Sequence, residues 1–169
     1  MENDIRAWDP SGLDGLLLSL EKRPIVSVRH GRFPDPVAPD HRLPSVAAQV
    51  HGLVAEVHPI WERYLATAGV PPTASQVETR LQPLGTDEAL ELMTTLAAED
   101  LARPGMLHMN REIAHHTVTR IVNWLGPGTT WWTNRHGTSQ EPVSACTFDG
   151  VVAGSDGEYF AVLVQLDED

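Results

Sequence analysis

The fold of this chain is decided by its C-terminal residues 143–166, which read VSACTFDGVVAGSDGEYFAVLVQL. Runs rich in β-branched and aromatic residues flank a cluster of glycine, serine and aspartate at 154–157. Glycine adopts the positive φ angles of tight turns without steric cost, so this arrangement is typical of a β-hairpin. We therefore predict a strand over 143–153, a turn at 154–157 and a return strand over 159–166.

Apolar residues recur at helical spacing upstream of the hairpin. The predicted helices cover residues 11–23, 45–68, 73–84, 86–102 and 110–125. Pro59 is expected to kink or split the second of these helices. Two further strands are predicted at 25–28 and 129–133, and the first is expected to pair with the C-terminal strands.

The order of these elements predicts a single α+β domain over residues 1–169. Most helices precede a run of three strands, which favours helices and sheet in separate layers. We expect three to five helices packed on one face of a small, mostly antiparallel sheet.

Composition restricts the classes of partner. The chain carries 23 acidic and 12 basic residues, a formal net charge of −11. Such a charge disfavours nucleic acid and anionic membranes and favours a basic protein partner, or serves solubility alone. The single cysteine, the acidic N-terminus and the absence of a long apolar run predict a cytoplasmic protein without a membrane segment.

Eight histidines invite a search for metal ligands. Glu112 and His115 fall on one helical face, but adjacent His115 and His116 point about 100° apart. A carboxylate-bridged di-iron site needs a second Glu-x-x-His motif, which the sequence lacks. We expect no metal and no cofactor; the alternative ligand set is His108, Glu112, His115 and His116.

Cys146, His136 and Asp149 form a possible Cys-His-Asp set. A reactive thiol requires a helix N-terminus or a nearby cation, and the predicted strand supplies neither. We therefore expect a buried, inert cysteine. No Gly-x-Ser-x-Gly elbow and no glycine-rich phosphate loop occurs.

Tryptophans and acids suggest a recognition surface instead. Neighbouring Trp131 and Trp132 must face opposite sides of a strand, so one indole is expected at the surface unless a helix or a partner covers it. From Cys146 onward there are six acids and no lysine or arginine. The predicted partner-binding residues are Trp131, Trp132, Asp149, Asp156, Glu158, Asp167 and Glu168.

These features predict an acidic, cytoplasmic protein-binding module. Its specific form is an immunity or antitoxin-like inhibitor of a basic toxin or nuclease, in which carboxylates occupy the place of phosphate. The alternative is a small-molecule or metal-dependent enzyme with a pocket between the helices and the sheet. A structural or regulatory subunit of a larger assembly would share the predicted binding surface.

Overall fold

The computed structural model describes residues 12–65 and 69–168. Its centre is an antiparallel sheet of five strands in the order β1-β7-β6-β3-β2. The strands are β1 (Val26–Arg32), β2 (Gln82–Leu84), β3 (Thr130–Thr133), β6 (Phe148–Ser155) and β7 (Tyr159–Asp167). A separate two-stranded ribbon consists of β4 (Arg135–His136) and β5 (Ser139–Gln140).

The C-terminal hairpin is confirmed. Strands β6 and β7 pair from Phe148↔Asp167 to Ser155↔Phe160, and Gly157 in the turn has a φ of +96°. Residues 143–147 do not extend the first strand as predicted. Two backbone N–H groups of this segment donate to a buried side chain of β6 instead of to a neighbouring strand.

Five α-helices and one 3₁₀ turn accompany the sheet in the described residues. They are α1 (Leu13–Leu18), η2 (Pro39–His41), α2 (Arg42–Trp61), α3 (Ala74–Arg80), α4 (Thr86–Ala98) and α5 (Arg111–Leu125). The side chain of Asn110 caps α5 by accepting from the N–H of Ile113. Pro59 does not split α2, because it lies in the last turn and the helix ends two residues later.

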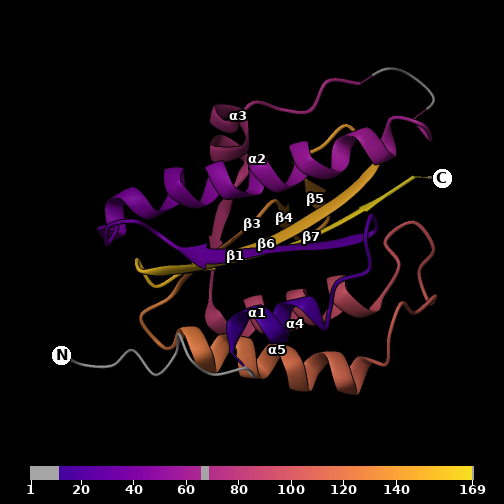
Figure 1. The fold of residues 1–169 in the computed structure, drawn as a ribbon. Coiled ribbons are helices and arrows are strands. Elements are labelled where there is room, and N and C mark those ends of the chain that lie inside the picture. Colours follow the sequence, from indigo (N-terminus) through magenta and orange to yellow (C-terminus); the bar gives the residue numbers. More distant parts are fainter. Residues whose placement is uncertain (1–11, 66–68, 169) are drawn as a thin grey trace.

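The α+β class is confirmed, but the expected one-sided arrangement of helices is wrong. Helices α2 and α3 cover one face of the sheet, and α1, α4 and α5 cover the other (Figure 1). The reason lies in β7, where every residue is buried and both alternating sets are largely apolar. A sheet that is apolar on both faces must be covered on both faces.

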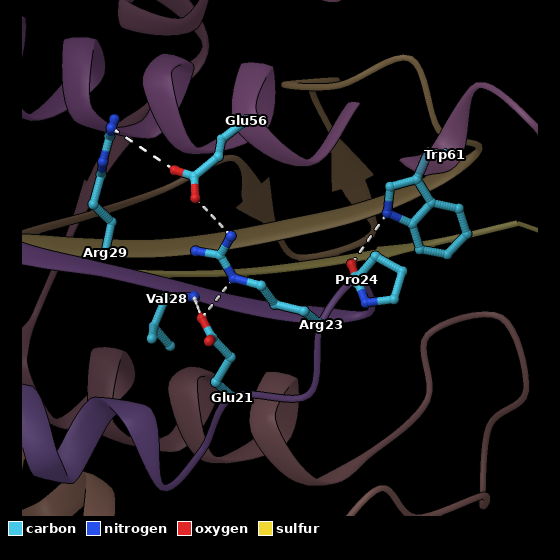
Figure 2. Close-up of polar contacts among 7 residues, drawn as sticks. All are labelled: Glu21, Arg23, Pro24, Val28, Arg29, Glu56 and Trp61. Atoms are coloured by element: carbon cyan, nitrogen blue, oxygen red, sulfur yellow. Dashed lines mark hydrogen bonds and ion pairs between the residues drawn. The ribbon is translucent and has the colours of Figure 1, made fainter. Parts of the chain in front are cut away.

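Side chains occupy part of the outer edge of β1 (Figure 2). A carboxylate oxygen of Glu21 accepts from the N–H of Val28 at 3.0 Å, and Arg23 contacts both Glu21 and Glu56, at 3.0 and 2.6 Å. An open strand edge invites pairing with other chains, and this network blocks part of it. It also ties α2 to the turn before β1.

Within the described residues, no helix has both the length and the apolar character needed to cross a bilayer.

Candidate functional site

The structure buries both tryptophans of β3. Trp131 is 1% exposed in the core beneath α4 and α5, and Trp132 is 5% exposed in the core beneath α2. The two indoles do face opposite sides of the sheet, but each side has its own helical layer. The prediction of an uncovered indole is therefore wrong, and the alternative that helices cover both faces is correct.

Asp149 is also inside the protein, fully buried at the start of β6. Its carboxylate accepts five hydrogen bonds: from the side-chain amides of Asn134 and Gln140, from the N–H groups of Val143 and Ser144, and from the Ser144 hydroxyl. Burial raises the pKa of Asp149, and these donors oppose that shift. Asp149 therefore organises residues 134–147 and presents no charge to a partner.

The other predicted acids do not gather on one surface. Asp156 and Glu158 lie at the turn between β6 and β7, whereas Asp167 and Glu168 lie at the far end of β7. A strand of nine residues separates the two pairs by about 27 Å. Glu158 is also paired with Arg32, at 2.8 Å. The predicted Trp/acid surface does not exist as a unit.

Acidic residues instead collect on the layer of α1, α4 and α5. These three helices carry five exposed acids and two arginines, whereas α2 and α3 carry one exposed acid, one half-buried acid and two arginines. Four of the seven exposed large apolar residues described also lie on this layer or on the connection from α4 to α5. We define the acidic helical face as Asp14, Leu18, Asp87, Glu88, Glu91, Met106, Leu107, Glu112 and Ile113.

Cys146 is buried, as predicted. It is 8% exposed, and burial raises the pKa of its thiol to about 12. Both carboxylate oxygens of Asp149 are occupied by other donors, so they do not orient a histidine; the side chain of His136 lies outside the described part. The thiol therefore stays protonated at neutral pH, which disfavours nucleophilic catalysis.

The alternative metal ligands are not brought together. His115 lies 3.5 Å from Glu91 on the surface, and Glu112 and His116 are exposed on the same helix. His108 lies elsewhere, with its Nε2 atom 3.7 Å from Oδ2 of Asp100. That prediction of a shared site is wrong because His108 precedes α5 and turns toward the sheet.

The described residues contain one group with metal-ligand geometry: Asp100, His108 and Asp167. One ligand atom from each residue lies within 4.8 Å of the other two. Burial lowers the pKa of His108, against the attraction of Asp100, and burial also raises the pKa of Asp167. Asp100 falls within the predicted helix 86–102 and Asp167 among the predicted partner-binding residues, and no spacing in the sequence links either of them to His108.

Two surface hollows lie in the part of the chain that the structure describes. One of about 310 Å³ is lined by Arg80, Gln82, Asn134, Ser139 and Glu141. Another of about 200 Å³ is lined by Thr86, Val122, Asn123, Gly126 and Pro127. Neither lining combines a nucleophile with a histidine base.

No protein family model, curated protein sequence or solved structure matches this chain.

Proposed function

We propose that this chain is an acidic protein-binding module, and that the acidic helical face binds a basic protein. The specific form we propose is an immunity or antitoxin-like inhibitor of a basic toxin or nuclease. The observation that carries the proposal is the coincidence of unbalanced acids and exposed apolar side chains on one helical layer. This surface replaces the tryptophan-centred surface expected from the sequence.

The apolar residues supply affinity in this proposal. Leu18 is 55% exposed, Leu107 56% and Ile113 60%, on segments that gather in the layer of α1, α4 and α5 (Figure 1). A single exposed apolar side chain is ordinary, but several on neighbouring elements favour a contact surface. Burying one side chain of this size fully contributes about 1.5–3 kcal/mol.

The acids supply orientation and speed of association. Carboxylates that outnumber arginines attract a basic surface, and this steering weakens as salt screens it. A nuclease has a basic site for phosphate, and carboxylates at the surface of an inhibitor complement the same charges. The net charge of −11 makes this class of partner the best electrostatic match.

Copurification with the protein encoded by the neighbouring gene tests the proposal, followed by affinity measurements at two salt concentrations. We expect a complex whose association slows as salt rises. Ile113→Lys should weaken it by about tenfold or more, since about 1.4 kcal/mol corresponds to a factor of ten.

Val70→Lys is the matched control, because Val70 is 90% exposed and lies outside the acidic helical face. Equal loss of affinity in both variants, or binding that ignores salt, would count against the proposed surface. A basic protein that neither copurifies nor binds would count against the function itself.

A further inference from the structure

The geometry points to a binding site for one divalent transition-metal ion, formed by Asp100, His108 and Asp167. The site shares no residue with the acidic helical face, although His108 directly follows Leu107 in the chain. It lies where the segment after α4 meets the C-terminal end of β7, on the same side of the sheet as α4.

The first argument is the imidazole of His108. Its side chain is 6% exposed, and the Nε2 atom is buried without a hydrogen-bond partner. This nitrogen lies 3.7 Å from Oδ2 of Asp100, beyond hydrogen-bond distance, and close to a carboxylate oxygen of Asp167. A buried polar atom without a partner costs free energy, and a metal ion would satisfy it.

The second argument is the uncompensated pair of carboxylates. Asp100 is 5% exposed and Asp167 is 9% exposed. Among the described residues, no lysine or arginine forms an ion pair with either one. Two neighbouring carboxylates away from water repel each other unless they share a proton or a cation lies between them, and a divalent ion supplies that cation.

The third argument is the way in which the ligands are held. Oδ1 of Asp100 accepts from the N–H of Arg103 at 2.8 Å, and Oδ1 of Asp167 accepts from the N–H of Glu168 at 2.9 Å. The side chains of Asp100 and Asp167 also lie within hydrogen-bonding reach of each other, and a bound ion would replace that contact. Outer hydrogen bonds of this kind are a general feature of metal sites.

The backbone beside the site is fixed as well. The N–H of His108 donates to the carbonyl of Ala98 at 2.7 Å. Buried Gln165 of β7 donates to the carbonyls of Leu96 and Glu99 and accepts from the N–H of Leu101. Residues 96–101 are therefore anchored to β7 two positions before Asp167.

The ligand chemistry selects the class of ion. Two carboxylates and one imidazole suit Zn²⁺, Mn²⁺, Fe²⁺ or Co²⁺, whereas Mg²⁺ and Ca²⁺ prefer oxygen ligands alone. Metal–ligand bonds of about 2.0–2.2 Å place tetrahedral ligand atoms about 3.4 Å apart. The 3.7 Å separation of Nε2 of His108 and Oδ2 of Asp100 is close to this value, and the ligand atom of Asp167 lies within 4.8 Å of both residues.

Calorimetric titration of tag-free, chelator-treated protein with Zn²⁺ tests the site. We expect one ion per chain, with Mg²⁺ and Ca²⁺ binding more weakly. His108→Gln and Asp167→Asn should each weaken Zn²⁺ binding by about tenfold or more. His115→Gln is the matched control, because His115 is a surface histidine beside Glu91, and it should leave the affinity unchanged.

Wild-type protein supplies a readout that does not depend on the folding of variants. Paramagnetic Co²⁺ should shift or broaden the amide signals of residues 99–110 and 165–168 first. Perturbations centred on His115 and His116, the absence of stoichiometric Zn²⁺ or Co²⁺ binding, or full affinity in a folded His108→Gln variant would overturn the assignment. None of these outcomes bears on the partner-binding proposal, which is measured without added metal.

Discussion

Two clusters of charged side chains near the same end of the sheet differ in how their charges are balanced. Around Arg23, the carboxylates of Glu21 and Glu56 pair with a guanidinium, and Arg23 and Glu56 are 36% and 47% exposed (Figure 2). Around His108, two buried carboxylates meet an imidazole without a hydrogen-bond partner at Nε2. The first cluster is balanced by a guanidinium, whereas no lysine or arginine among the described residues forms an ion pair with the two carboxylates of the second.

The contrast shows that a charged cluster indicates a ligand when its buried charges are not compensated by other protein groups. Exposed ion pairs contribute little and close a strand edge here. Buried charges are costly unless cations or hydrogen-bond donors compensate them. Asp149 is a useful third case, because it is buried but receives five hydrogen bonds. The cluster of Asp100, His108 and Asp167 has neither form of compensation in full.

The largest effect is expected from Asp149→Ala. The substitution leaves several buried donors unpaired, so the free energy of unfolding should fall by about 3–4 kcal/mol. Urea denaturation measures this change. Asp149→Asn retains one acceptor oxygen and should cost less; a loss below about 1 kcal/mol for the alanine variant would contradict the role of Asp149 as the centre of residues 134–147.

A smaller effect of opposite sign is expected from Asp167→Asn in metal-free protein. Removing one of two adjacent buried carboxylates relieves their repulsion, so stability should stay equal or rise by about 1 kcal/mol. Chemical denaturation in the presence of chelator measures it. A loss of several kcal/mol would show that protein groups already balance the charge of Asp167, and the contrast between the clusters would disappear.

The smallest effect is expected from Arg23→Ala. Because its partners are near the surface, the loss should be about 0.5–1 kcal/mol at neutral pH and should shrink at high salt. The hydrogen bond from Arg23 lowers the pKa of Glu56. A carboxyl group whose pKa is lowered on folding stabilises the protein at pH values above the pKa of the unfolded state, and this stabilisation is lost as the pH falls through the folded-state pKa. The difference in stability between Arg23→Ala and wild type should therefore fade in acid.

Thermal unfolding of wild-type and Arg23→Ala protein across pH 3–7 checks this last prediction. Glu62→Gln, which changes an exposed carboxylate outside the network, is its control. A larger difference in acid than at neutral pH would contradict the assigned role of the ion pair.

Local pattern was sufficient for much of the fold. The helix after Asn110, the turn at 154–157 and the return strand β7 depend on residues close together in the chain, so helical periodicity and turn chemistry predicted them. The two-sided helical cover was also encoded, because both alternating sets of β7 are apolar, but the element order suggested a one-sided layer. The sequence pattern did not determine the exposure of Trp131, because that exposure depends on which helices pack over β3.

The sequence by itself determined the α+β class, the C-terminal hairpin, the strong negative charge and the approximate places of the helices, but the predicted helix 73–84 was wrong at residues 82–84, which form β2. Tertiary structure alone decided that Trp131 and Trp132 are covered, that Asp149 is internal, and that His108 meets Asp100 and Asp167. The physical reason is that local propensity acts over a few residues, whereas these contacts join residues that are far apart in the chain. The contact of His108 with Asp100 and Asp167, for example, follows from the packing of α4 and the segment after it against β7. The separation of side chains in space is set by that long-range packing, which spacing along the chain does not encode.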